Sequence, residues 1–232
     1  MGMAQLVKPE NLQPHRLDWP GGLGQLCSIP TGSGFRLSAQ EVGLLSAAER
    51  NRLLKNIRPE KTQRSLAARA KLRKMLGQIL CLSPEQVAFV TDAEGRPGLD
   101  PRYNIGTDQL DFSVSYGPQG YCVGIARGRA IGVDLQRFSH KQKQSFDHLF
   151  GNNFARRNQT RLEPQQIWTR MEAYGKMQGQ GLGYGMHALY KIAIDARTAP
   201  IPCHFLDYRL GAGTSLSVCI SGPPAGPLCV MN

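Results

Sequence analysis

The stretch that decides the fold is residues 110–136, which read LDFSVSYGPQGYCVGIARGRAIGVDLQ. It holds three short apolar runs separated by connections rich in Gly, Pro and Arg, a pattern typical of successive β-strands. The first connection, residues 116–120, is expected to form a five-residue hairpin-like loop. The three predicted strands are residues 110–115, 121–126 and 130–136.

The last of these strands alternates between apolar and other residues. The two faces hold, respectively, Ile131, Val133 and Leu135, and Gly132, Asp134 and Gln136. A carboxylate and an amide oxygen on one strand face could hold a hard cation such as Mg²⁺. The pattern alone is weak evidence for a metal, because an Asp on the solvent-facing side of an edge strand is its more common cause.

On the N-terminal side, residues 1–35 are rich in Pro and Gly and are expected to form short strands and loops on the surface. Ser38 with Glu41 has the spacing of a helix capping box. Residues 62–81 carry apolar side chains at helical spacing and predict a helix. A strand at residues 87–91 is expected to follow, and then a turn region.

On the C-terminal side, residues 141–162 are polar and expected to be helical in part. Pro164 suits the first turn of a helix that runs to about residue 178 and ends in a glycine-rich segment. Runs of strands with a few helices predict an α+β fold. The remaining strands are expected at residues 188–194, 204–210 and 215–220.

Composition limits the class of protein. The chain has 232 residues, 41% hydrophobic and 19% charged, which is enough for one domain or two halves with a real core. Because no stretch suits a membrane helix or a signal peptide, a cytoplasmic protein that does not bind membranes is expected. The six cysteines lack metal or disulfide spacing and are expected to be reduced and mostly buried.

The net charge of +11 indicates partners rather than fold. Residues 50–74 hold ten Lys or Arg against one acid, and residues 127–161 hold eight against two. Such patches fit a nucleic acid, a phosphorylated small molecule or an acidic protein, although charge alone favours a solvated basic surface. A dinucleotide-binding GxGxxG, a P-loop, a zinc-type spacing and a GxSxG elbow are all missing from the sequence.

Two further constellations could carry chemistry. Trp168, Glu172 and Lys176 recur every four residues on one face of the predicted helix. The Glu–Lys spacing also fits an ordinary stabilising pair, but a lysine next to a glycine-rich opening can meet phosphates. The tripeptide Gly95-Arg96-Pro97 could present main-chain N–H groups and a guanidinium to a phosphate or a base, and alone it indicates only a turn.

Taken in order, these segments resemble the 4′-phosphopantetheinyl transferases, and in particular the larger, monomeric type that modifies peptide- and polyketide-synthase carrier proteins. The resemblance covers about residues 40–220, and its most specific parts are the Ile-Gly-Val-Asp strand and the helix that ends in Gly-x-Gly-Leu. The segments that carry it are residues 64–73 (RSLAARAKLR), 95–97 (GRP), 112–115 (FSVS), 131–135 (IGVDL), 168–176 (WTRMEAYGK) and 179–182 (GQGL).

The resemblance implies two similar α/β halves related by a pseudo-twofold axis, with coenzyme A in the cleft between them. Residues 1–128 would form the half that binds the 3′-phosphate and adenine. Residues 129–232 would form the half with the metal and the catalytic helix. A carrier-protein serine would attack the β-phosphate of coenzyme A, and 3′,5′-ADP would leave.

The resemblance also implies residue roles. Glu172 would be the general base and Lys176 would hold the pyrophosphate and help the leaving group. Mg²⁺ would be held by Asp134, Gln136 and Glu172. Coenzyme A would further contact Arg64, Gly95, Arg96, Pro97, Ser115 and Tyr116.

Three positions depart from the family pattern. Ser-His-Ser is Ser115-Tyr116-Gly117, so a hydroxyl replaces a charged contact to the 3′-phosphate. Asp-x-Glu ends in Gln136, with one less negative charge. Trp-x-x-Lys-Glu has Met171 in place of the lysine, so one cationic contact to phosphate is lost. The acids and Lys176 are retained, which favours an active but divergent enzyme.

The leading hypothesis is therefore an Mg²⁺-dependent monomeric transferase of secondary-metabolite biosynthesis that acts on an acidic carrier protein. The first rival is a weakened homologue that binds coenzyme A or a carrier protein without turnover. The second is a nucleic-acid-binding module, which is disfavoured because aromatics are only 7% and no basic-aromatic platform is visible. The particular carrier, the pathway and tolerance of acyl-coenzyme A are not encoded in any recognisable motif.

Overall fold

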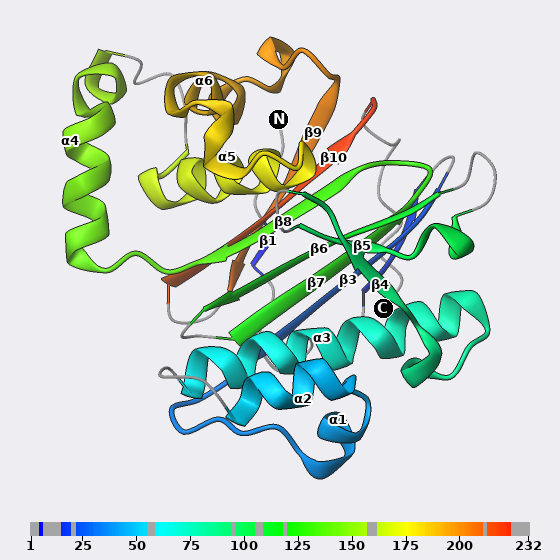
Figure 1. Ribbon diagram of the computed structural model, residues 1–232. Coiled ribbons are helices and arrows are strands. Elements are labelled where there is room, and N and C mark those ends of the chain that lie inside the picture. Colours follow the sequence, from blue (N-terminus) through cyan, green and yellow to red (C-terminus); the bar gives the residue numbers. More distant parts are fainter. Residues whose placement is uncertain are drawn as a thin grey trace. The chain divides into compact units, whose positions relative to one another are not determined.

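The computed structural model (Figure 1) describes residues 5–6, 15–19, 22–54, 59–93, 96–104, 109–117, 120–156, 162–210 and 213–223. Helices and strands are mixed, so the predicted α+β class is confirmed. The helices are α1 (Ala39–Gly43), α2 (Ala47–Leu54), α3 (Pro59–Leu80), α4 (His140–Arg156), α5 (Pro164–Met177) and α6 (Met186–Ile194). Within the described ranges, no helix has both the length and the apolar character required to cross a membrane.

The strands lie in two four-stranded sheets and one two-stranded sheet among the described residues. The first sheet has the order β1-β9-β10-β8, the second β2-β3-β7-β6, and β4 pairs with β5. The strands are β1 (Gln5–Leu6), β2 (His15–Trp19), β3 (Gly22–Pro30), β4 (Phe89–Thr91), β5 (Pro97–Leu99), β6 (Leu110–Gly117), β7 (Gly120–Arg127), β8 (Ile131–Gln136), β9 (Cys203–Leu210) and β10 (Thr214–Ser221).

The chain forms two compact units that meet in sequence between Ala130 and Ile131. The amino-terminal unit contains β2 to β7 with α1 to α3, and the carboxy-terminal unit contains β8 to β10 with α4 to α6, together with β1. The roles expected for the two halves in binding coenzyme A stay predictions.

The amino-terminal unit is an antiparallel sheet covered by α3, which packs on β6 and β7 (Figure 1). The apolar stripe of α3 and the inward side chains of these strands form its core, in which Leu72, Leu76 and Val123 are completely buried. The expectation that residues 1–35 form only surface strands and loops is wrong for β3. β3 lies inside the sheet between β2 and β7, and Cys27, which pairs with Val123, is 2% exposed because it packs in the core of the unit.

The carboxy-terminal unit places α5 across β8 and β10, with α6 packed against α5 (Figure 1). β8, β10 and β9 are antiparallel neighbours, whereas β1 adds to β9 in parallel. The strand predicted at residues 188–194 is wrong, since this segment belongs to α6. Its buried residues follow the spacing of one helical face, which a short apolar run does not distinguish from a strand: Leu189, Tyr190, Ile192 and Ala193.

The two units repeat one topology. In the first, β3 is followed by α3, β6 and β7, with spatial order β3-β7-β6; in the second, β8 is followed by α5, β9 and β10, with spatial order β8-β10-β9. Each unit therefore has a strand, a covering helix and a hairpin whose last strand lies in the middle. The pseudo-twofold axis stays a prediction.

Several local predictions are confirmed. The helix at residues 62–81 is α3, and Ser38 with Glu41 forms both hydrogen bonds of a capping box. The predicted strands around residues 110–136 and at 204–210 and 215–220 are β6 to β10. The first hairpin is tighter than expected, because Tyr116 pairs with Tyr121 and the strands extend to Gly117 and Gly120.

Candidate active site

The site begins with a close approach of α5 to β8. A Cβ atom on Gly132 would lie 1.9 Å from the main-chain oxygen of Ala173 and 2.6 Å from the nitrogen of Met177. Only glycine allows such contact, so α5 comes much nearer to this face of β8 than a side chain would permit. Alternation places Asp134 on the same face. Asp134 is only 6% exposed. The interpretation of Asp134 as an ordinary acid on the solvent-facing side of an edge strand is therefore wrong.

Lys176 connects the end of α5 to Asp134. Its Nζ donates to Asp134 Oδ1 at 2.7 Å and to the main-chain oxygen of Val133 at 3.1 Å. The lysine side chain remains 29% exposed, whereas the Asp134 side chain is 8% exposed. Two oxygens of β8 therefore hold the ammonium group of Lys176, and part of the lysine side chain remains accessible to solvent.

Glu172 lies one helical turn before Lys176 and is half-buried. Burial raises the pKa of its carboxyl, the nearby Asp134 charge raises it further, and Lys176 partly opposes both effects. Glu172 therefore lies near enough to Asp134 and Lys176 for both charges to act on its carboxyl. The structure thus brings together the acid of the predicted strand and the Glu–Lys pair of the predicted helix.

Glycines also shape the end of α5. A Cβ on Gly175 would lie 2.4 Å from the main-chain oxygen of Gly181, so the short 3₁₀ helix η4 (Gly181–Tyr184) packs directly on the helix. Gly179 and Gly181 have φ values of 76° and 53°, which favour glycine. The glycine-rich segment after Lys176 therefore folds back and packs against α5 near that lysine.

A buried polar network on another side of α5 was not predicted. Arg170 donates Nε and Nη2 to Asp207 Oδ2 on β9 and Nη1 to the main-chain oxygen of Ala193. Ser217 donates to Asp207 Oδ1 at 2.7 Å and lies 2.8 Å from Thr169 Oγ1. Sequence spacing could not reveal it, because Asp207 is 37 residues from Arg170. Arg170 thus anchors α5 to β9 and to the end of α6.

Met171 occupies a different environment from the one that the family motif implied. Its side chain is 0% exposed, so this helix position faces the interior. The loss of a cationic phosphate contact at residue 171 assumed a side chain that reaches the ligand. A lysine at residue 171 would have to bury its ammonium group or extend it from the interior to solvent, and burying an unpaired charge costs folding free energy.

Carboxylate chemistry at this site suits a hard cation. Asp134 and Glu172 bring two acids together, and Gln136 lies on the same strand face as Asp134 by alternation. Among the described residues, no group of three or more His, Cys, Asp or Glu gathers as a metal site. A set of two carboxylates and one amide still fits Mg²⁺, which retains several waters and needs few protein ligands. The main-chain oxygen of Gln136 accepts from Gln165 Nε2 at 3.0 Å.

Arg64 is enclosed in the amino-terminal unit. It is 5% exposed, and its Nε donates to Thr31 Oγ1 at 2.8 Å and its Nη2 to the oxygen of Gly32 at 3.0 Å. Its Nη1 donates to Glu60 Oε2 at 3.3 Å. The guanidinium therefore fixes the segment after β3, and a phosphate contact would have to use the donors that these bonds leave.

The other residues predicted to bind coenzyme A lie in the same unit. Arg96 is half-buried, with Nη2 3.4 Å from Asp111 Oδ1, and Pro97 begins β5. Ser115 is 5% exposed on β6, whereas the next residue, Tyr116, is 38% exposed. Gly95 lies outside the described residues.

Asp134 of β8 and Glu172 and Lys176 of α5 thus form one acid–lysine group. No family model matches the chain. It is 30% identical over 158 residues to a protein of Synechocystis sp. with a provisional assignment as a 4′-phosphopantetheinyl transferase, covering 62% of this chain and 61% of that relative. It is also similar to the 4′-phosphopantetheinyl transferases psf-1 of Bacillus pumilus (22% identity, 78% of each chain) and HetI of Nostoc sp. (30% identity, 53% of this chain and 55% of the relative).

The resemblance inferred from the motifs is thereby confirmed, because the relatives are named as transferase enzymes of that one family. The chain spans about 61% of the length of the Synechocystis relative that it matches.

Proposed function

We propose that this protein transfers the 4′-phosphopantetheine arm of coenzyme A to a serine of an acidic acyl or peptidyl carrier protein and releases 3′,5′-ADP. The observation that carries the proposal is the convergence of Asp134, Glu172 and Lys176 where Gly132 lets α5 approach β8. Phosphoryl transfer depends mainly on positioning and on neutralising charge, and this cluster offers a fixed cation and two acids.

Each residue has a role in the proposal. Glu172 accepts the serine proton, because its carboxylate lies beside Asp134 and one helical turn before Lys176, where the reacting groups would meet. Lys176 contacts the pyrophosphate and stabilises the leaving group. Asp134, Glu172 and Gln136 would hold Mg²⁺, which supplies charge neutralisation at the pyrophosphate.

The residues proposed for the 3′-phosphate and adenine belong to the amino-terminal unit. Arg64, Ser115 and Tyr116 would contact the 3′-phosphate, and residues 95–97 would contact the adenine. We propose a monomer, as in the larger type of the family, in which the amino-terminal unit binds the nucleotide and the carboxy-terminal unit carries the metal and the catalytic residues. The net charge of +11 supports an acidic partner, because complementary charge raises association rates.

The test is an intact-mass assay against a panel of carrier proteins, with coenzyme A and Mg²⁺. A mass increase of one phosphopantetheine arm that requires both components is expected. Glu172→Gln and Lys176→Ala should each lower turnover by at least about a hundredfold. The matched controls are Glu163→Gln, at the start of the same helix, and Lys191→Ala, an exposed lysine of α6; both should keep normal turnover.

The outcomes separate the proposal from its rivals. Normal turnover in the Glu172 and Lys176 variants would refute the mechanism. A wild-type protein that binds coenzyme A but modifies no carrier would instead be the weakened homologue. A wild-type protein that binds neither coenzyme A nor a carrier protein would contradict both the transferase and the weakened homologue.

A further inference from the structure

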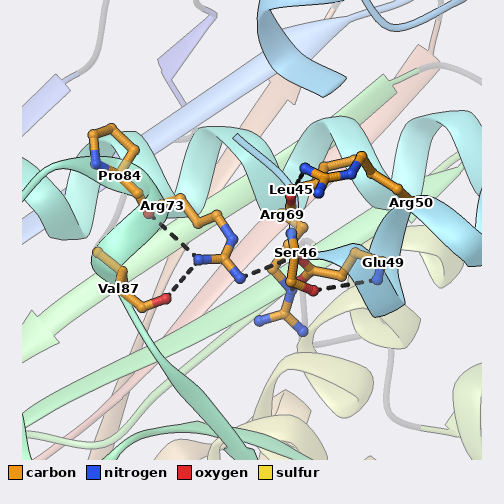
Figure 2. Close-up of polar contacts among 8 residues, drawn as sticks. All are labelled: Leu45, Ser46, Glu49, Arg50, Arg69, Arg73, Pro84 and Val87. Carbon is orange, nitrogen blue, oxygen red and sulfur yellow. Dashed lines mark hydrogen bonds and ion pairs between the residues drawn. The ribbon is translucent and has the colours of Figure 1, made fainter. Parts of the chain in front are cut away.

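A second charged cluster lies in the amino-terminal unit and contains none of the residues to which the proposed function assigns a role (Figure 2). Glu49 of α2 accepts from the main-chain nitrogen of Ser46 at 2.8 Å, in a capping box completed by Glu49 N to Ser46 Oγ. The same carboxylate pairs with Arg69 Nε at 3.3 Å and with Arg73 Nη2 at 3.1 Å. We call Glu49, Arg69 and Arg73 the Glu49 cluster.

Arg73 extends this cluster to a different segment of the chain. It is 5% exposed, and its Nη1 donates to the main-chain oxygens of Pro84 and Val87 (Figure 2). These oxygens lie in and just after the 3₁₀ helix η2 (Pro84–Gln86), directly before β4. One buried guanidinium therefore connects the acid of α2 to the entry of the β4–β5 hairpin.

Phe89, the first residue of β4, strengthens this connection. Its ring centroid lies 4.4 Å from Arg69 Cζ and 5.0 Å from Arg73 Cζ. Both guanidiniums are within the range of a cation–π contact, and the shared Glu49 carboxylate lowers their mutual repulsion. The hairpin is therefore attached through its main chain and through its first side chain.

The hairpin needs such an attachment. Each of its strands has three residues, and a two-stranded sheet of that size is not stable by itself. Its far end pairs Thr91 with Pro97, and Arg96 N donates to Asp92 Oδ1 at 2.7 Å. Arg96 and Pro97 are the described residues that we propose for the adenine side of coenzyme A.

We infer that Arg73, held by Glu49, is a positioning residue that sets the β4–β5 hairpin for coenzyme A. The inference rests on the proposed function. Arg73 acts through the main chain of residues 84–89 and does not touch the ligand itself. It predicts that a change in Arg73 weakens recognition of the nucleotide part of coenzyme A and leaves the chemical step intact.

The test compares Arg73→Lys with Arg50→Lys. A lysine at residue 73 keeps the charge but cannot reach the carboxylate and both carbonyls from one planar fork. Arg50 is exposed and donates to the main-chain oxygen of Leu45, so it is a matched control in the same region (Figure 2). For Arg73→Lys we expect the KM for coenzyme A to rise about tenfold, with kcat within about twofold of wild type.

Two ligand fragments locate the effect. Calorimetric affinity for 3′,5′-ADP should fall about tenfold in Arg73→Lys, while 4′-phosphopantetheine, which lacks the nucleotide, should inhibit wild type and variant equally. Hydrogen exchange should show faster exchange in residues 89–91 and 98–99, with α3 unchanged. Arg50→Lys should match wild type in all three measurements. Glu49→Gln should reproduce the Arg73→Lys result, provided that assays are run well below its melting temperature.

The outcomes separate this inference from the proposed function. If wild type transfers the arm but Arg73→Lys keeps normal KM and 3′,5′-ADP affinity, the positioning role is refuted and the function stands. A lowered melting temperature with unchanged KM and hairpin exchange would likewise refute it, because that is a purely structural role. If wild type neither transfers nor binds coenzyme A, the proposed function fails, and hydrogen exchange alone still decides whether Arg73 holds the hairpin.

Discussion

At the scale of single residues, the absence of a side chain at Gly132 allows α5 to lie directly against β8. Its position fixes the distance between α5 and β8, and two residues later Asp134 meets Lys176. A glycine at such a position is replaced only by moving main chain, because the atoms in the way belong to Ala173 and Met177 of the helix backbone.

We therefore expect Gly132→Ala to lower the free energy of unfolding by about 1–3 kcal/mol and to separate Lys176 from Asp134. Denaturant titration measures the first effect, and loss of transfer activity would report the second. Gly151→Ala is the control, because a Cβ there meets no atom within 4 Å on α4. That change should stabilise the protein by about 0.5–1 kcal/mol, as expected for Gly to Ala in a helix.

Met171→Lys restores the residue typical of the family and would be expected from sequence to improve coenzyme A binding. Burial of this side chain predicts the opposite, a loss of about 2 kcal/mol or more in unfolding free energy. Met171→Leu, which conserves volume and apolar character, should cost less than about 1.5 kcal/mol. Thermal melts with activity assays check both variants. A stable and more active lysine variant would mean that residue 171 can turn its side chain toward the ligand.

Glu172 makes stability depend on pH. Its pKa in the folded protein is raised above the ordinary value of 4.5, so the folded state binds this proton more tightly than the unfolded state. Its stabilising contribution is complete below about pH 4.5 and is lost as pH rises through the folded pKa. Glu172→Gln should therefore melt at a higher temperature than wild type above the folded pKa, with the difference shrinking toward pH 4. A difference in melting temperature that does not change with pH would contradict this sign.

The residue scale also shows what sequence could predict of the site. Alternation along β8 gave Asp134 its correct face, and helical spacing gave Glu172 and Lys176 a common one. Neither pattern tells what covers a face, so the burial of Asp134 and of Met171 was missed. Arg64 was predicted from the resemblance as a ligand contact, and its bonds to Thr31 and Gly32 depend on a loop that spacing does not reveal.

At the scale of elements, α5 is held by charge on one side and by glycine contacts on the other. The Arg170–Asp207 pair has side chains that are 17% and 10% exposed, and Arg170 also lies 5.0 Å from the ring centroid of Phe205. Removing one partner of a buried pair leaves the other charge uncompensated, which costs more than the pair itself contributes.

We expect Asp207→Asn to lower the free energy of unfolding by about 3 kcal/mol. Glu163→Gln provides the comparison, because Glu163 pairs with Arg209 through side chains that are 61% and 48% exposed. That exposed pair should contribute less than about 1 kcal/mol. Urea titration of the two variants measures both values. Equal losses would indicate that water screens the Arg170–Asp207 pair as well.

Elements differ in how well sequence predicts them. α3 and α5 are long, and both were found: α3 from the helical spacing of its apolar residues, and α5 from Pro164 at its start. The nine-residue α6 was predicted as a strand, because its apolar run is too short to show a period and it packs on α5. β3 was placed at the surface, since its glycine-rich start concealed a strand that lies between two others.

At the scale of the whole molecule, the family resemblance implied two similar halves, but the strand order that they share could not be deduced from local sequence patterns. The shared order of strand, helix and hairpin is carried by different residues in the two units, and no short repeat is visible. The matching order appears only when the pairing of β3 with β7 and of β8 with β10 is known. Fold class followed from the mixture of elements, whereas strand order required the structure.

The parallel pairing of β1 with β9 constrains how the gene could be divided. Gln5 and Leu6 pair with Tyr208 and Arg209, so the beginning of the chain belongs to the unit that is otherwise encoded after residue 130. A fragment that starts at Ile131 would leave β9 as an unprotected edge strand, a template for association with other chains. In a split-protein reporter, or in a chimera that exchanges halves between relatives, the segment with Gln5 and Leu6 would therefore have to be kept together with the carboxy-terminal unit.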